Sequence, residues 1–398
     1  MASDKKVKQK RIPRRVDGIE SRNKIKAAAI DLFSKSSFSD VSISQITKRA
    51  KMSTSAFYQY YINKDELFRE ILEEFFEDLN DNLKASNLKE SALNYLEYAK
   101  KNQKLFKIVH LNEYLFEWIR NEYDGIFRNI SEKFDLTDVG YFYFWSPLKF
   151  VVGFSDLIET EIVGEHFIDL LVSGIIPKCS DVLIPEVFAF QPKKHVIEID
   201  EKREHILANA ETLFGTHGYE KTQVYDIAKA SGIAVGTFYL YFKNKLELLH
   251  ELVRWINKGL KYNVKLAVER CQKCNRLVQE IAGLYAFVQF FKMHSNMYRI
   301  VRESQTIDRD IAKEYYLSIY RPYVNALRKS VESGNLVLKG KYIYEEEINY
   351  LVIMLMSFGH YMGEKYLLTG QMKGEKREIL EFFLKELYEY ICRGLGVK

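Results

Sequence analysis

The chain has 398 residues, of which 47% are hydrophobic and 28% charged, so a soluble globular protein with two or more domains is expected. Its net charge of +5 is unevenly distributed, because residues 1–64 carry a net charge of +10 and the remaining residues −5. A basic end on an acidic body is typical of a protein that binds a polyanion. Since the sequence has no Gly-rich phosphate loop, G-x-S-x-G or H-E-x-x-H motif, we do not expect an enzyme.

The sequence also argues against a secreted or membrane-bound protein. Four cysteines are too few for a disulfide framework in so long a chain. The most apolar window, Leu351–Leu368, contains the charged residues Glu364 and Lys365, which argues against a membrane span. A single C-x-x-C pair, Cys271 and Cys274, supplies only two of the four ligands of a zinc site, so two free thiols are expected. We therefore expect a cytoplasmic protein without a metal or cofactor.

Long stretches with an apolar residue every three or four positions, and only 6 prolines, predict an all-α fold. The sequence divides into two halves, each with three short helices followed by a body of longer helices. The expected segments are a basic arm (1–16), a first three-helix module (17–64), a first body (65–177), a linker marked by clustered prolines (178–200), a second module (201–245) and a second body (246–398).

An internal repeat supports this division. The segment Arg22–Leu72 recurs at Arg203–Val253 with a constant shift of 181 residues, and 16 of the 51 aligned pairs are identical. Because the repeating unit is a whole domain, and not a period of about 20–50 residues, a solenoid is excluded. One chain therefore carries the same small helical module twice.

The second copy has the clearer local signals. An apolar face over Lys202–Phe214 predicts a first helix, and Gly218 permits the turn that follows it. Thr222 is placed to cap a second helix at Val224–Ala230, and a third helix is expected from about Val235 to Tyr241. This helix–short turn–helix spacing can place the third helix in the major groove of DNA.

The run from Ile227 to Lys245, I-A-x-x-x-G-I-x-x-G-T-F-Y-x-Y-F-x-N-K, closely resembles the TetR/AcrR family of transcriptional regulators. The resemblance implies binding to double-stranded DNA and, most often in this family, repression that responds to a small-molecule effector. An alternative from a different class is an architectural or protein-interaction factor that has kept the fold, with one or both modules not reading sequence.

By this resemblance, the DNA-facing residues lie at the start and on the outer face of the third helix of each module: Thr54, Ser55, Tyr58, Gln59, Tyr60 and Lys64 in the first, and Val235, Gly236, Thr237, Tyr239, Leu240, Tyr241 and Lys245 in the second. The lysines and tyrosines are expected at phosphate or sugar. Gln59 could pair with adenine, whereas Leu240 could touch only a thymine methyl group. Phe57 and Phe238 are expected in the core.

The first copy departs from the family pattern. Lys51, Ser37 and Ala56 stand where the second copy has two glycines and a threonine. A left-handed turn residue other than glycine costs about 1 kcal/mol. The spacing of Ser42 and Gln45 matches a capping box, which compensates in part. Two unlike modules predict an operator with two unlike half-sites, to which the basic arm adds phosphate attraction.

The bodies carry the remaining expectations. By resemblance, Val139–Ile175 and Glu345–Arg393 should pair within one chain as an internal pseudo-dimer, although pairing of two chains stays open. An aromatic-rich body indicates either helix core or a mostly apolar pocket for an aromatic or acyl effector. The candidate pocket residues are Phe106, His110, Tyr114, Trp118, Phe287, Phe291, Tyr298, Tyr316, Tyr320 and His360.

Overall fold

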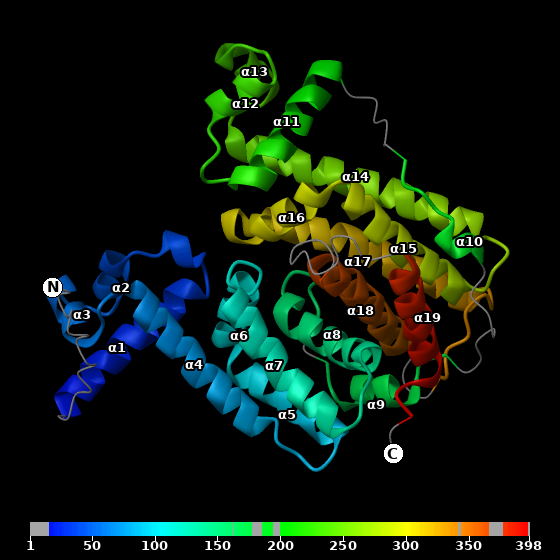
Figure 1. The fold of residues 1–398 in the computed structure, drawn as a ribbon, viewed down its shortest axis with the longest axis horizontal. Helices are drawn as coiled ribbons and strands as arrows, with labels where there is room; N and C mark the ends of the chain where they lie inside the picture. Colours follow the sequence, from blue (N-terminus) through cyan, green and yellow to red (C-terminus); the bar gives the residue numbers. More distant parts are fainter. Residues whose placement is uncertain are drawn as a thin grey trace, which may run out of the picture. The chain divides into compact units, whose positions relative to one another are not determined.

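The computed structural model describes residues 16–161, 163–176, 185–193, 200–340, 344–365 and 377–396. Every regular element within these ranges is a helix, as the sequence predicts (Figure 1). The basic arm and most of the expected linker lie outside the described residues. The chain forms two compact units: unit 1 comprises Met1–Ser86 and Glu97–Ile126, and unit 2 comprises Asn87–Leu96 and Phe127–Lys398.

Unit 1 contains the first module and the helices packed on it. Its elements are α1 (Val16–Phe33), a short 3-10 helix η1 (Phe38–Asp40), α2 (Ile43–Arg49), α3 (Thr54–Tyr60), α4 (Lys64–Asn82), the end of α5 (Leu88–Lys101), α6 (Gln103–Asn112) and the first part of α7 (Glu117–Lys133).

Unit 2 contains the second module and helices from both sequence halves. After the first part of α5 and the end of α7 it comprises α8 (Asp138–Phe154), α9 (Glu165–Ser173), α10 (Pro185–Phe188), α11 (Glu201–His217), α12 (Val224–Ala230), α13 (Val235–Tyr241), α14 (Lys245–Arg270), α15 (Arg276–Met293), α16 (Ser295–Ile307), α17 (Arg309–Glu332), α18 (Tyr344–Gly363) and α19 (Arg377–Arg393). The compact units therefore do not follow the boundary of the repeat.

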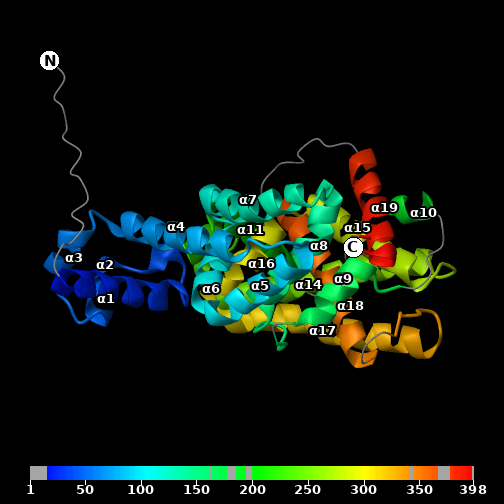
Figure 2. The ribbon, with the colours of Figure 1, turned by 90° about the horizontal axis from the view of Figure 1, so that it is seen from below.

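The last helices of the two halves pack together inside unit 2. Helix α8 lies against α18 and α19 (Figures 1 and 2). The Phe142 ring lies 5.7 Å from that of Phe358 and meets the Phe383 ring edge-on at 4.9 Å. At the start of α8, the Thr137 and Tyr390 hydroxyls are 2.9 Å apart. Segments on either side of the expected linker thus share one apolar interface.

In each of the two modules, an Arg–Glu ion pair at equivalent repeat positions joins the first and fourth helices. Arg22 on α1 pairs with Glu70 on α4 through Nη2 and Oε2 at 2.5 Å. At the equivalent repeat positions, Arg203 on α11 donates from Nε to Glu251 on α14 at 2.9 Å. Both pairs join the first helix of a module to its fourth helix, which follows the third helix. We call the third helix of each module, α3 or α13, its recognition helix. They explain why an Arg and a Glu recur 48 residues apart in both copies.

A lysine holds the turn of each module. Lys64 Nζ donates to the carbonyl oxygens of Phe38 and Val41 at 2.6 and 2.7 Å. Lys245 makes the two equivalent bonds, 181 residues further along, at 2.9 and 3.1 Å. Each ammonium group also lies 4.1 Å from the centre of an aromatic ring in that turn. Each turn thereby gains a charged donor for two of its carbonyls, of which that of Tyr219 also accepts from the Thr222 amide at 3.3 Å.

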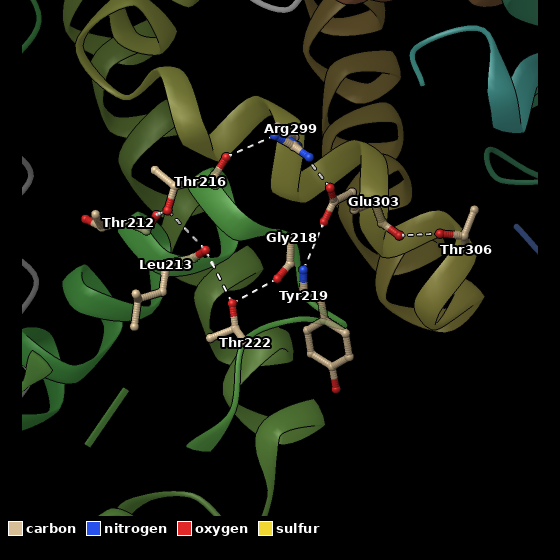
Figure 3. Close-up of polar contacts among 10 residues, drawn as sticks. Thr212, Leu213, Thr216, Gly218, Tyr219, Thr222, Arg299, Glu303 and Thr306 are labelled. Carbon is tan, nitrogen blue, oxygen red and sulfur yellow. Dashed lines mark hydrogen bonds and ion pairs between the residues drawn. The ribbon is translucent and has the colours of Figure 1, made fainter. Parts of the chain in front are cut away.

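Two local expectations are wrong in part. Thr222 does not cap α12, because its buried hydroxyl donates to the carbonyls of Gly218 (2.8 Å) and Leu213 (3.3 Å), toward α11 (Figure 3). The N-cap residue is Gln223. Ser37 has a φ of −56°, outside the left-handed region, since η1 reshapes the first turn. Lys51 does adopt a positive φ, 56°, as expected, and the capping box at the start of α2 is present.

Helices α11 and α16 pack so closely at Gly215 that there is no room for a side chain at this position. A Cβ atom built on Gly215 would overlap the side chain of Asn296, so only glycine fits there without movement. Gly236, by contrast, lies in α13 with no atom within 4 Å of such a Cβ. The contrast provides a matched pair of substitutions.

We expect Gly215→Ala to lower the free energy of unfolding by about 1–3 kcal/mol, because the added methyl group forces α11 and α16 apart. Gly236→Ala should raise it by about 0.5–1 kcal/mol, because alanine is favoured over glycine in an open helix position. Urea denaturation followed by circular dichroism measures both. Equal effects of the two changes would contradict the close approach.

We expect Lys245→Met to lower the free energy of unfolding by about 1–2 kcal/mol, because two carbonyls lose a charged donor. The neighbouring Lys243 is exposed, so Lys243→Met is the control and should have little effect. The same denaturation assay compares them. A Lys245→Met protein as stable as the Lys243→Met protein would show that the lysine does not hold the turn.

Candidate functional site

The outer faces of the two recognition helices are exposed where the sequence places DNA-facing residues. On α3, Thr54, Ser55, Tyr58 and Gln59 are exposed and Tyr60 is partly buried. On α13, the residues Val235, Gly236, Tyr239 and Leu240 are exposed, and Thr237 and Tyr241 are partly buried. Phe57 and Phe238 are fully buried beneath them, which confirms their expected role in the core. Each recognition helix thus presents one apolar face inward and one face to solvent.

The two exposed faces differ in chemistry at equivalent positions. Gln59 offers an amide on α3, whereas the equivalent residue on α13, Leu240, exposes 83% of an aliphatic side chain. Ser53 caps α3 by accepting a hydrogen bond from the Ala56 amide at 3.2 Å. Ala234, at the start of α13, has no such side-chain bond. The first module therefore presents hydroxyl and amide groups where the second presents aliphatic ones.

Each recognition helix carries two tyrosines, Tyr58 and Tyr60 on α3 and Tyr239 and Tyr241 on α13. Their surroundings are only partly equivalent in the two modules. Tyr58 and Tyr239 expose 57% and 52% of their surface, and each packs edge-on against the phenylalanine that precedes it. The hydroxyl of Tyr241 is hydrogen-bonded to Asp200, and this bond to a carboxylate raises the pKa of Tyr241. Asp200 was not expected to lie beside the second recognition helix. Its repeat equivalent is Ile19, so no such carboxylate stands at that position in the first module.

Lys64 and Lys245 are less available than the sequence suggests. Burial lowers the pKa of both ammonium groups, and each makes two hydrogen bonds within its own module. Only one of their three N–H groups is left for another partner. The repetition of Asn-Lys at the start of the fourth helix in both copies is the sequence signal for this structural role.

Unit 2 contains a partly open cavity of about 590 Å³, within the size range of small-molecule sites. Its walls are α14, α15, α17 and α18, and Tyr298 of α16 completes them. The lining is mostly apolar, and includes Val264, Val268, Leu284 and Phe287. Such a lining suits a ligand with an apolar body.

A charged cluster lines the cavity on α15 and α17. Glu280 accepts a hydrogen bond from the Tyr323 hydroxyl and pairs with Arg276 at 2.5 Å. Burial raises the pKa of Glu280 and that of Tyr323. These three residues were not among the sequence candidates, because nothing in the sequence marks them as buried. They could orient a polar group of a ligand.

A second polar cluster lines the cavity between α16 and α18. The Tyr298 hydroxyl lies 2.8 Å from His360 Nδ1 and donates to the His360 carbonyl oxygen at 2.7 Å. Beyond it, Arg302 pairs with Glu364 at 2.8 Å, although the arginine is only 1% exposed. Burial raises the pKa of Tyr298. The cluster fixes the contact between the two helices at the cavity wall.

The structure brings four of the six second-half candidates to the cavity: Phe287, Tyr298, Tyr316 and His360. Phe291 lies behind this lining, with its ring 4.9 Å from that of Phe287. Tyr320 donates to Asn349 at 3.2 Å and is not part of the lining.

The four first-half candidates belong to unit 1 and do not line this cavity. Phe106 packs among other rings and meets the Phe75 ring edge-on at 5.0 Å. His110 lies 3.4 Å from Glu113, and both are buried. The Arg69 guanidinium lies over the Trp118 ring, 4.3 Å from the ring centre. Tyr114 is partly buried at the end of α6. For these four residues a pocket role stays a prediction.

Cys271 and Cys274 do not belong to a metal site in the part of the chain that the structure describes. Cys271 and Cys274 are free thiols, and burial raises the pKa of Cys271 to about 11. Cys392 is disulfide-bonded. Among the described residues no group of three His, Cys, Asp or Glu side chains could hold a metal ion. Nor does that part of the chain contain a helix with the length and apolarity needed to cross a bilayer.

Comparison with known proteins identifies the modules. The family model described as bacterial regulatory proteins, tetR family, matches twice, at residues 25–71 and 206–252. Two relatives from Bacillus subtilis are described as uncharacterized HTH-type transcriptional regulators. YhgD is 28% identical over 138 residues, 35% of this chain and 71% of the relative. YerO is 25% identical over 210 residues, 50% of this chain and 67% of the relative.

Among solved structures, the fatty acid degradation regulator FadR from Bacillus halodurans is 19% identical, with a TM-score of 0.41, and covers 51% of this chain and 100% of its own. FadR from Bacillus subtilis in complex with stearoyl-CoA is 18% identical, with a TM-score of 0.39, and covers 49% and 99%. Both family matches coincide with the helix-turn-helix modules described above. The chain therefore carries two domains of the tetR family of bacterial regulatory proteins in tandem.

Proposed function

We propose that this protein is an effector-responsive transcriptional repressor of the cytoplasm that binds one operator with two unlike half-sites and catalyses no reaction. The observation that carries the unlike half-sites is the exposed pair at one repeat position, an amide at Gln59 and an aliphatic side chain at Leu240. An amide can make two hydrogen bonds to adenine, whereas an aliphatic group can only contact a thymine methyl group. Identical subunits could not present this difference.

The other exposed residues would position the modules on the phosphate backbone. The hydroxyls of Tyr58 and Tyr239 are exposed and could donate to phosphate oxygens. Lys64 and Lys245 would each use the one remaining N–H group there. In the proposed interface these residues add affinity without sequence choice, together with Thr54, Ser55, Tyr60, Val235, Gly236, Thr237 and Tyr241.

We further propose that the packing of α8 and α9 with α18 and α19 replaces the dimer interface of two-chain relatives. The ring contacts of Phe142 and the Thr137–Tyr390 hydroxyl pair join the two sequence halves in one unit. A single chain would then present both modules to one operator. A further pairing of two chains would place four modules in one assembly.

The cavity of unit 2 is the proposed effector site. Its volume and apolar lining support an aromatic or acyl compound, and the cluster around Glu280 supports a polar group on that compound. Effector binding would favour a conformation with lower affinity for the operator. This cavity supports a ligand-responsive regulator over an architectural factor.

We expect selection from random DNA to return an asymmetric site for the wild-type protein. Gln59→Leu should lose about 1–3 kcal/mol of base discrimination in one half-site only, because the bidentate amide contact is gone. Leu240→Gln is the matched change in the other module and should alter the preference of the other half-site. A perfect palindrome for the wild-type protein would contradict the proposal.

We expect one chain to bind one operator duplex. Sedimentation of the protein with a labelled duplex measures the stoichiometry directly. A complex that contains two chains on each duplex would show that the internal interface is not sufficient for operator binding.

We expect the protein to bind the fluorescent probe anilinonaphthalene sulfonate, and Gly359→Leu to weaken this binding at least tenfold. Gly359 lines the cavity, and a Cβ there meets only ordinary contacts at 3.8 Å from Leu284 and Phe287, so a larger side chain fills space that the probe needs. Leu115→Ala, at an exposed position in unit 1, is the control and should bind the probe as the wild type does. Unchanged binding by Gly359→Leu would place the probe elsewhere.

A further inference from the structure

Helix α16 has one face on the cavity and another on the second module. Tyr298 lines the cavity and presses against α18, where a Cβ on Gly363 would lie 2.6 Å from its ring. The next residue, Arg299, donates from Nη1 to the Gly215 carbonyl oxygen of α11 at 3.2 Å (Figure 3). Two consecutive residues of one helix therefore contact the cavity wall and the second module.

The contact continues into the turn of the second module. Arg299 Nε donates to Glu303 at 3.0 Å, and the other carboxylate oxygen of Glu303 accepts from the Tyr219 amide at 3.3 Å (Figure 3). The carbonyl of Tyr219 in turn accepts from Lys245, the first residue of α14. We call Arg299 and Glu303 the α16 clasp. The clasp and Lys245 are therefore hydrogen-bonded to the same turn of the second module.

Helix α14 forms a second rigid connection. It begins at Lys245, four residues after the end of the recognition helix α13, and its later residues Leu260, Val264 and Val268 line the cavity. A helix of 26 residues is about 39 Å long, since each residue adds about 1.5 Å. Helix α14 therefore holds α13 at a fixed distance from the cavity, whereas the clasp is the contact that a displacement of the cavity wall would change.

At the positions of the clasp, the first half of the chain carries different residues. The repeat continues at Leu105–His110 and Met297–Arg302, where the shift is 192 residues. Arg299 therefore corresponds to Lys107 and Glu303 to Leu111, so the carboxylate is replaced by an apolar side chain. Helix α6 instead contacts α1 through Lys104 and Asp31 at 2.7 Å, on a lysine that is 60% exposed. All residues that line the cavity lie between 260 and 360, in unit 2, whereas the first module lies in unit 1.

We propose that occupancy of the cavity changes the second module alone, through the α16 clasp, while the first module stays on its half-site as a permanent anchor. The proposal rests on the cavity being the effector site and adds the direction in which its signal travels. Regulation would then be one-sided: the effector releases one half-site, and the chain remains held by the other. Two identical subunits could not do this, because each would carry the same clasp.

Hydrogen–deuterium exchange of the full chain tests the proposal, with anilinonaphthalene sulfonate as the probe. We expect saturating probe to change exchange rates in α11–α13 at least fivefold and those in α1–α3 less than twofold. The double variant Arg299→Lys, Glu303→Leu copies the first-half residues. It should bind the probe within twofold of the wild type but lose the response in α11–α13.

Lys104→Gln, which removes the α6–α1 ion pair, is the matched control and should keep the wild-type response. An equal response in both modules, or a response that survives in the double variant, would overturn the proposal. Footprinting on the selected operator gives a second readout, in which the probe should expose only the half-site of the second module.

The cavity itself can be tested separately from the signal. If the wild type does not bind the probe, hydrogen–deuterium exchange is measured without a ligand on the variants Gly359→Leu and Ala326→Phe. In these variants the larger side chain fills the cavity in place of the probe. A change in exchange confined to α11–α13 in either variant supports one-sided transmission even though the probe site has failed. No change in α11–α13, or equal change in both modules, in the variants that retain the wild-type circular dichroism spectrum overturns it.

Discussion

Each recognition helix is held in place by one ammonium group. Lys64 and Lys245 start the helix that follows the recognition helix and reach back to two carbonyls of the turn before α2 or α12. Peptide carbonyls left without a donor are costly, and a charged donor bonded to two of them fixes their separation. Because the turn sets where the second and third helices begin, the orientation of both depends on this group.

Local signals predicted the modules well. Helices α12 and α13 begin and end where the sequence indicates, because turn residues and apolar spacing act over a few positions. The hydrogen bonds from Lys64 and Lys245 to their turns were not predicted, since the bonded carbonyls lie 26 and 23 residues away in sequence. For the same reason Thr222 was assigned to the nearest helix start, whereas its hydroxyl turns back to α11.

The cavity shows more clearly which features could not be predicted from the sequence. Aromatic residues such as Phe287 and Tyr298 could be proposed from composition, because large rings line most apolar sites. The sequence could not indicate that Glu280 is buried beside Arg276, since an Arg and a Glu four residues apart on a helix are usually exposed to solvent. Nor could the repeat show that α8 would join the unit of the second half.

The packing of α8 against α18 and α19, as the proposed replacement of a dimer interface, also has a consequence for gene dosage. A regulator that must dimerise has an active concentration that grows with the square of its monomer concentration when dimers are scarce. When both partners of the interface lie on one chain, assembly is first order and independent of dilution. The amount of assembled protein then follows the copy number of the chain linearly, down to a few molecules in a cell.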